Sequence, residues 1–147
     1  MSETKEKIMK YLREQYGVEN IDFEIKEKEN KKLYAFKRCE DIDVEEHRHF
    51  NGLYFGRLCK DGLRLSIEGS FLIGRIAKYG VIDLNREEAE RWLSGENLKR
   101  KEKGYVILRW RSYYLGCGKG DGKMIKNFVP KERRLTHGDK RVSKKDA

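Results

Sequence analysis

The sequence is poor in proline and cysteine and has no long apolar run. One proline excludes proline-rich linkers, and three cysteines (Cys39, Cys59 and Cys117) are too few, and odd in number, for a disulfide framework. No apolar stretch approaches the ~20 residues that a membrane-spanning helix needs, and the N-terminal residues lack the apolar segment of a secretory signal. The sequence therefore predicts a cytoplasmic protein with no membrane partner.

Positive charge is plentiful and unevenly distributed. The chain has 34 Lys and Arg residues against 25 Asp and Glu, a formal net charge of +9. Residues 1–50 hold 11 basic and 13 acidic side chains, residues 51–98 hold seven of each, and residues 99–147 hold 16 basic and five acidic. The excess lies entirely in the last third, where it predicts a directional attraction for a polyanion. A solvated charged surface with a basic tail is the alternative.

The first 48 residues are expected to form a small α/β unit. Helical spacing predicts a helix over Thr4–Tyr16 that ends at Gly17. Alternation of apolar and polar residues predicts two strands, at 21–25 and 33–36, joined by a turn at 28–31. The acidic stretch 38–49 is interpreted as a connection to the next unit.

Residues 49–134 are expected to form a β-rich domain, which makes the fold class α+β. We predict strands at 53–58 and 63–67 around an Asp61-Gly62 turn, a strand-like or irregular stretch at 71–82, a helix from N-cap Asn85 to Gly95, and strands at 105–110 and 113–115. In the strand at 105–110, alternation places Val106, Leu108 and Trp110 toward the core, with Arg109 on the opposite face together with Arg111. Residues 135–147 have no periodicity and are expected to be a disordered basic tail.

The most unusual segment runs from Leu115 to Arg134. Glycines occupy every second position from 116 to 122, which predicts that the backbone approaches a ligand closely. Lysines and arginines occur throughout the same segment and suit phosphate oxygens. A dinucleotide-cofactor site does not fit, because the residues between Gly122 and Pro130 are too few for a crossover helix, and no Gly-Lys-Ser/Thr of a phosphate-binding loop occurs. No cofactor is expected.

Just upstream, residues 109–114 interleave cations with aromatic rings. Stacking of a nucleobase on a tyrosine or tryptophan ring contributes ~1–3 kcal/mol per base, and neighbouring cations can hold the flanking phosphates. Core packing accounts equally well for Trp110 and for one of the two tyrosines. The arginines and one tyrosine, assigned to Tyr113, remain candidates for nucleic-acid binding.

No catalytic constellation stands out. Cys39, His47 and His49 match no closed zinc pattern, so no metal site is predicted. Cys117 lies between two glycines, but no histidine stands near it in sequence to act as a base. The acidic residues at 87–90 suit the first turn of a helix. We therefore expect a protein that is not an enzyme.

The residues from about Phe50 to Arg134 resemble a known RNA-binding module. Leu115-Gly116-x-Gly118-Lys119, then Gly122-Lys123-x-Ile125-Lys126-Asn127, then Pro130-Lys131-x-Arg133-Arg134 is similar to the closing motif of the PUA-like C-terminal domain of the Fmu/Sun family of rRNA cytosine-5 methyltransferases. Where that family usually has a Pro-Ser-His-like stretch after the hairpin, this chain has Ser66-Ile67-Glu68. The resemblance implies a PUA-like, β-barrel-type domain, here without the methyltransferase domain and its catalytic cysteine motifs.

Together these observations predict a non-catalytic protein that binds structured rRNA or tRNA in ribosome biogenesis or RNA modification. The predicted RNA-binding residues are Arg109, Arg111, Tyr113, Lys119, Lys123, Lys126, Asn127, Arg133 and Arg134. A separate RNA methyltransferase or a pre-ribosomal particle is a further candidate partner. One alternative is an accessory subunit that docks on such a partner through Tyr54 and Phe55; another is a thiol-dependent RNA-modifying activity at Cys117.

Overall fold

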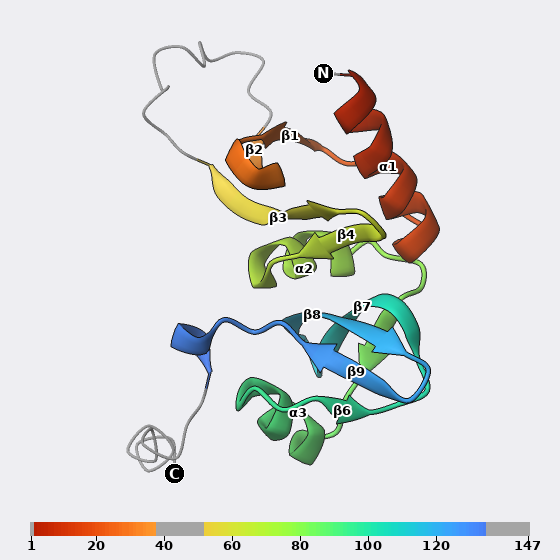
Figure 1. Cartoon of the computed structure of the whole chain (residues 1–147), viewed down its shortest axis with the longest axis vertical. Helices are drawn as coiled ribbons and strands as arrows, with labels where there is room; N and C mark the ends of the chain where they lie inside the picture. Colours follow the sequence, from red (N-terminus) through yellow and green to blue (C-terminus); the bar gives the residue numbers. More distant parts are fainter. Residues whose placement is uncertain (1, 38–51, 135–147) are drawn as a thin grey trace.

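The computed structural model describes residues 2–37 and 52–134. Four antiparallel strands form the first sheet in the order β1-β2-β3-β4. Figure 1 shows helix α1 alongside this sheet, above the second sheet. The elements of this part are α1 (Ser2–Tyr16), β1 (Phe23–Glu27), the 3-10 turn η1 (Glu29–Lys31), β2 (Lys32–Lys37), β3 (Leu53–Cys59) and β4 (Gly62–Leu65).

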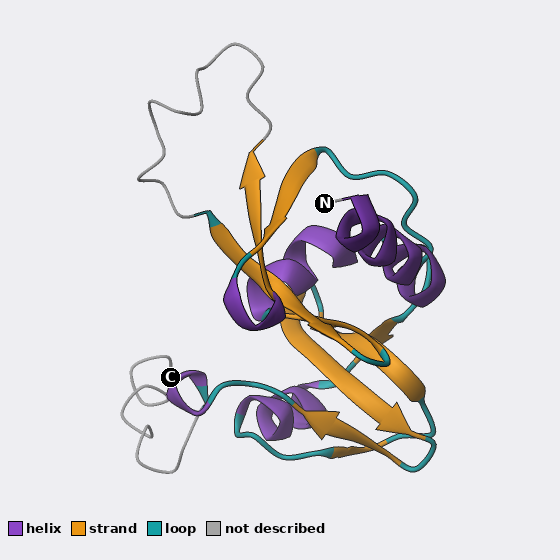
Figure 2. Ribbon diagram, turned by 45° about the horizontal axis from the view of Figure 1, so that its top comes forward, coloured by secondary structure: helices purple, strands orange, loops and turns teal. Residues whose placement is uncertain are grey.

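The second sheet has the order β5-β7-β8-β9-β6, with β5 parallel to β7 and the other pairs antiparallel. It curls into a half-barrel, which is consistent with a PUA-like domain, so the predicted α+β class is confirmed. Figure 2 shows α3 packed beside this curled sheet. The elements are α2 (Ile67–Gly74), β5 (Val81–Asp83), α3 (Arg86–Leu93), β6 (Leu98–Lys99), β7 (Lys103–Trp110), β8 (Tyr113–Asp121), β9 (Met124–Asn127) and η3 (Lys131–Arg133).

The predicted N-terminal helix and hairpin are present. Gly17 follows α1 with a φ of +69°, the left-handed conformation expected at a helix end. The hairpin β1–β2 continues into β3 and β4 within one sheet, so this sheet takes strands from both sides of the predicted boundary at residue 48. That boundary stays a prediction. The acidic connection at 38–49 and the basic tail at 135–147 lie outside the described residues.

Two apolar clusters stabilise the fold. The first joins α1, one face of the first sheet and one face of the second, and it includes Tyr105 and Ile107 of β7. The second lies between α3 and the opposite face of the second sheet, and it includes Val106 and Leu108. Strand β7 is therefore buried on both faces. The prediction of a single buried face was wrong because an uninterrupted apolar run suits a strand between two layers.

The largest error in the predicted elements concerns residues 66–74. Ser66 and Ile67 were predicted to lie in a strand and 71–82 to be strand-like or irregular, whereas α2 spans Ile67–Gly74. The Ser66 hydroxyl accepts a hydrogen bond from the Gly69 backbone N–H at 2.9 Å, as an N-cap does. A Cβ on Gly69 would lie 2.0 Å from the Phe55 carbonyl oxygen, so this helix packs directly on β3. A short helix packed this closely carries apolar residues on several sides, and its periodicity resembles that of a buried strand.

The segment 115–127 forms the hairpin β8–β9. Its glycines make room for the protein itself: a Cβ on Gly118 would lie 2.6 Å from the Trp92 ring, and one on Gly120 would lie 2.1 Å from the Glu102 carbonyl oxygen. The interpretation that these two glycines admit a ligand was therefore wrong.

The helix after Asn85 is confirmed, with the complete capping box between Asn85 and Glu88.

Candidate nucleic-acid interface

Three cations from both sheets meet around two aromatic rings. The guanidinium of Arg64, on β4, lies 4.5 Å from the centre of the Phe128 ring, and the Lys126 ammonium lies 5.8 Å from the same ring. The Lys119 ammonium lies 5.6 Å from the Tyr105 ring, whose centre is 6.4 Å from that of Phe128. We call these five residues the basic–aromatic cluster. Positive charges and the half-buried ring of Phe128 are features that nucleic acids recognise, whereas the Tyr105 ring is buried in the core.

The strand register explains the cluster. Tyr105 on β7 is opposite Lys119 on β8, and Lys119 is opposite Lys126 on β9, so the three side chains form one row on one face of the second sheet. Arg64 reaches this row from the first sheet. It alternates along β4 with the buried Leu63 and Leu65, which turns its side chain away from the core.

Asp61 orients part of the cluster. Its carboxylate forms an ion pair with Lys119 and accepts a hydrogen bond from the Tyr105 hydroxyl at 2.9 Å. The bond with Lys119, and to a smaller extent the bond with Tyr105, holds the pKa of Asp61 below its usual value. Burial is the first cause of the raised pKa of Tyr105, so its hydroxyl stays a donor. Within the described parts of the chain, Arg64 and Lys126 form no ion pair with a carboxylate, and their charge is available to a ligand.

A cavity lies next to the cluster, between the strands β3–β4, the start of α2 and the segment after β9. Its lining includes the aromatic rings of Tyr54 and Phe128 and the guanidinium groups of Arg64 and Arg133. Arg133 forms an ion pair with Glu68 at 2.7 Å, which holds it at the cavity rim. Arg134 donates from Nε to the Val129 carbonyl oxygen at 2.8 Å and covers Gly95. The two neighbouring arginines thus differ: Arg133 borders the cavity, and Arg134 supports the fold.

Three of the predicted RNA-binding residues, Arg109, Arg111 and Tyr113, lie near the turn of the β7–β8 hairpin, at the end away from Lys119. Tyr113 is 60% exposed and stacks on Trp110, with ring centres 5.9 Å apart, while the Arg111 guanidinium lies 4.8 Å from the Trp110 ring. Arg109 forms a bidentate ion pair with Asp83, at 2.6 and 3.0 Å. Tyr113 and Lys119 are six positions apart along β8, a distance of about 20 Å. The structure therefore divides the predicted residues between two surfaces.

Lys123 is exposed on the β8–β9 turn.

Asn127 is a structural residue. Its side chain is only 7% exposed, and its Nδ2 donates to the carbonyl oxygens of Trp92 at 2.7 Å and Glu96 at 2.8 Å. Its Oδ1 accepts from the Val129 backbone N–H at 2.7 Å. Both amide hydrogens are used inside the protein, which leaves none to donate to an RNA base or ribose.

Cys117 is buried, and its environment disfavours the reactive thiolate form. Its side chain is 2% exposed, and its Sγ lies 3.8 Å from the Tyr16 hydroxyl. Burial raises the pKa of this thiol to about 11. A nucleophilic thiol needs a lowered pKa and access to solvent. Neither condition of a thiol-dependent activity is met at Cys117.

This arrangement predicts selective alkylation. Burial keeps the Cys117 thiol protonated at about pH 8 and out of reach of solvent, so iodoacetamide is expected to modify the half-exposed Cys59 far faster than Cys117. Peptide mapping by mass spectrometry measures the two rates, and full modification of both in denaturant is the control. Equal rates in the folded protein would contradict the buried position of Cys117.

The structure does not support the other kinds of site considered from the sequence. Across residues 2–37 and 52–134, no group of three or more metal-ligating side chains comes together. The set Cys39, His47 and His49 lies outside the described residues. Phe55, predicted with Tyr54 to dock a partner, is fully buried and cannot do so. In the described part of the chain, no helix is long and apolar enough to cross a membrane.

The cluster contains residues that sequence reasoning missed: Arg64, Tyr105 and Phe128. The alternation of Arg64 with Leu63 and Leu65 was a usable signal, because it showed an outward-facing cation. Nothing in the sequence showed that Arg64 would meet Phe128, which is 64 positions away.

Comparison with known proteins supports the predicted resemblance. Residues 79–135 match the family described as methyltransferase RsmF PUA domain. The chain is 30% identical over 84 residues to ribosomal RNA small subunit methyltransferase F of Aeromonas salmonicida, covering 55% of this chain and 18% of that protein. The chain is 29% identical over 117 residues to the protein of the same name from Aliivibrio fischeri, and this match covers 78% of this chain and 24% of that protein.

The chain thus spans less than a quarter of the length of these curated relatives. The matched residues hold β5 to β9, α3 and the closing motif, including Lys119, Lys126 and Phe128 of the cluster. The resemblance inferred from the closing motif is confirmed: this chain carries, in residues 79–135, a segment similar to the PUA domain of RsmF methyltransferases.

Proposed function

We propose that this chain binds structured RNA, rRNA or tRNA, without catalysing a reaction on it, and that it acts in ribosome biogenesis or RNA modification. The similarity to the PUA domain of RsmF methyltransferases supports RNA binding, and the names of the relatives indicate small-subunit rRNA as the first RNA to test. The observation that carries the proposal is the meeting of Arg64, Lys119 and Lys126 around Phe128 and Tyr105.

Each part of the cluster has a role in this proposal. Arg64 and Lys126 contact phosphate oxygens, and Lys119 exchanges part of its bond with Asp61 for a phosphate. The cations position the RNA and carry little sequence information. Folded RNA presents closely spaced phosphates on a rigid frame, so a compact set of three cations favours shape over sequence. Arg133 lies beside Arg64 at the cavity and extends the positive surface.

The salt dependence of binding tests this proposal. With three phosphate contacts, the logarithm of the association constant is expected to fall with the logarithm of salt concentration at a slope of about −3. The measurement is a titration of labelled small-subunit rRNA fragments and a tRNA transcript at several salt concentrations. Absence of salt-sensitive binding to every structured RNA would exclude the proposal.

The accessory-subunit alternative rests on a different surface. Phe71 on α2 is an exposed aromatic residue, and its ring meets the Tyr114 ring edge to face at 5.9 Å. Exposed aromatic rings suit a protein partner as well as a nucleobase. A partner that stays bound after nuclease treatment, and is lost in a Phe71→Ser variant, would favour this alternative.

A further inference from the structure

The outer face of the first sheet carries a row of cations outside the segment that matches the PUA domain. Lys32 on β2 is opposite Arg57 on β3, and Arg57 is opposite Arg64 on β4. Residues directly opposite in antiparallel strands point to the same face, so these three side chains stand side by side at intervals of about 5 Å. Lys32 and Arg57 are exposed, and Arg64 is half-buried.

Two tyrosines lie beside this row on the same face. Tyr34 is two residues from Lys32 on β2 and is opposite Tyr54, and the two rings are 5.5 Å apart. A register shift next to Leu33 keeps Tyr54 on the face of Arg57. The charges of Arg64 and Arg57 both act on Tyr54, where they oppose the rise in pKa that burial causes.

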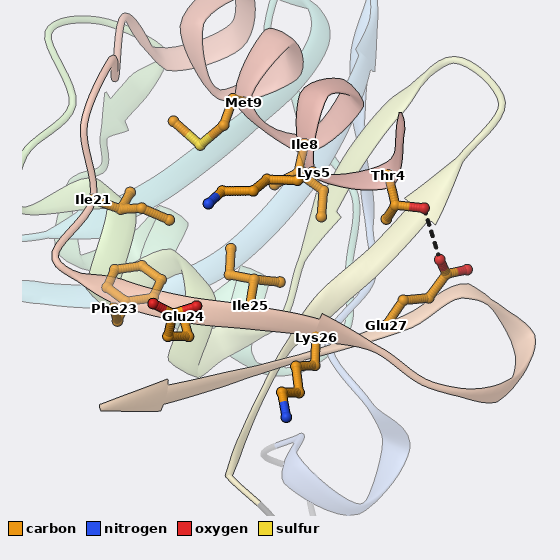
Figure 3. A pocket seen from close by; sticks show the side chains of 10 residues that line it. All are labelled: Thr4, Lys5, Ile8, Met9, Ile21, Phe23, Glu24, Ile25, Lys26 and Glu27. Carbon is orange, nitrogen blue, oxygen red and sulfur yellow. Dashed lines mark hydrogen bonds between the residues drawn. The ribbon is translucent and has the colours of Figure 1, made fainter. Parts of the chain in front are cut away.

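Lysines surround these rings. The Lys28 ammonium lies 4.9 Å from the Tyr34 ring, and Lys26 on β1 is directly opposite Tyr34. Figure 3 shows the side chain of Lys26 extending away from α1, while Ile21 and Ile25 point into the cavity between α1 and β1. The face toward α1 thus supplies the core, and the opposite face carries the lysines and tyrosines.

This arrangement is costly for the isolated fold. Like charges directly opposite each other in a sheet destabilise it, and Lys32, Arg57 and Arg64 form two such pairs in succession. On this face of β1 the described acidic residue is Glu24, which is opposite Phe36 and not within the row. A polyanionic ligand along the row would offset this repulsion.

We propose that this face binds a single-stranded segment of RNA, with its phosphates along Lys32, Arg57 and Arg64 and its bases stacked on Tyr34 and Tyr54. Stacking on rings that lie on a sheet requires unpaired bases, which excludes the interior of a duplex. The inference goes beyond the proposed function, because the site lies outside residues 79–135 and takes RNA of a different form. Arg64 belongs to both surfaces, so one RNA can pass from this face to the basic–aromatic cluster.

The test uses a labelled, unstructured single-stranded RNA of about eight to ten nucleotides, within the roughly 4–16 nucleotides that single-strand-binding OB-fold domains occupy. The double variant Tyr34→Ala/Tyr54→Ala is expected to bind it at least about tenfold more weakly, since each ring stacks one base. Tyr34→Phe/Tyr54→Phe keeps the rings and is expected to retain the affinity. Circular dichroism and thermal unfolding confirm that each variant is folded.

A charge test separates this face from the cluster. Lys32→Glu/Arg57→Glu is expected to weaken binding of the oligonucleotide about tenfold or more and to leave structured RNA within about twofold. The matched control is Lys7→Glu/Lys10→Glu, which reverses two exposed charges on α1, across the sheet. An equal loss in the control, unchanged affinity in Lys32→Glu/Arg57→Glu, or preference of this face for duplex RNA would overturn the inference. Structured RNA would still test the proposed function separately, through Lys119 and Lys126.

Discussion

Replacing Asn127 with alanine is expected to lower the free energy of unfolding by about 3 kcal/mol, because three hydrogen bonds inside the protein are lost at ~1 kcal/mol each. The change leaves the carbonyl oxygens of Trp92 and Glu96 and the Val129 N–H without their partner. Denaturant unfolding followed by tryptophan fluorescence measures the effect, and Trp92 next to the altered site reports on it directly.

The neighbouring position provides the control. Lys126→Ala removes an exposed side chain one residue away, and it is expected to change the free energy of unfolding by less than about 0.5 kcal/mol. RNA affinity distinguishes the roles further: Lys126→Ala is expected to weaken binding, whereas Asn127→Ala, under conditions where it is folded, is expected to bind normally. A stable Asn127→Ala protein with impaired RNA binding would contradict the structural role of Asn127.

The largest expected effect on binding comes from the basic–aromatic cluster. Lys126→Glu combined with Lys119→Gln is expected to weaken binding of structured RNA roughly tenfold per cation at about 0.1 M salt, because each lost phosphate contact removes about one unit from the salt slope. Glutamine at position 119 keeps a donor for Asp61 and avoids placing two carboxylates together. The measurement is the affinity for structured RNA at several salt concentrations, where the slope of the salt dependence is expected to change from about −3 in the unaltered protein to about −1 in the variant.

Three further variants locate the site. The control Lys7→Glu/Lys10→Glu changes the net charge more, yet is expected to retain the slope because α1 lies outside the cluster. Arg111→Glu tests the other end of the β7–β8 hairpin, and Lys123→Glu tests the β8–β9 turn. If the cluster variant binds structured RNA with unchanged affinity and slope, the RNA-binding surface lies elsewhere; loss in Arg111→Glu alone would place it at the hairpin end.

Local signals in the sequence predicted elements whose caps and core lie within a few residues. The helix after Asn85 was predicted from Asn85, Glu88 and Gly95, and the structure contains the capping box. The strand at 105–110 followed from a short apolar run that holds four β-favouring residues, Tyr105, Val106, Ile107 and Trp110. The resemblance to an RNA-binding module rested on closely spaced residues from 115 to 134, and residues 79–135 match that domain.

Elements that depend on distant partners were less predictable. Helix α2 was assigned to strand and irregular structure because its small residues fit against β3, a contact that periodicity does not report. Asn127 was assigned to RNA because its amide can hydrogen-bond a base edge or a ribose 2′-OH. Its three partners come from α3, the loop after α3 and the chain beyond β9, and only their approach buries it.

The amino-acid sequence alone predicted the segregation of positive charge, the likeness to an RNA-binding domain and, within the described residues, most of the strands and two of the three α-helices. Each of these depends on composition or on neighbours along the chain. The tertiary structure decided which cations lie together. The approach of the two sheets brought Arg64 to Phe128 and Asp61 to Lys119, whereas the pairing of β5 with β7 placed Asp83 beside Arg109. The length of β8 keeps Tyr113 and Lys119 apart. Electrostatic attraction depends on distances in space and on nearby opposite charges, and both are set by the fold.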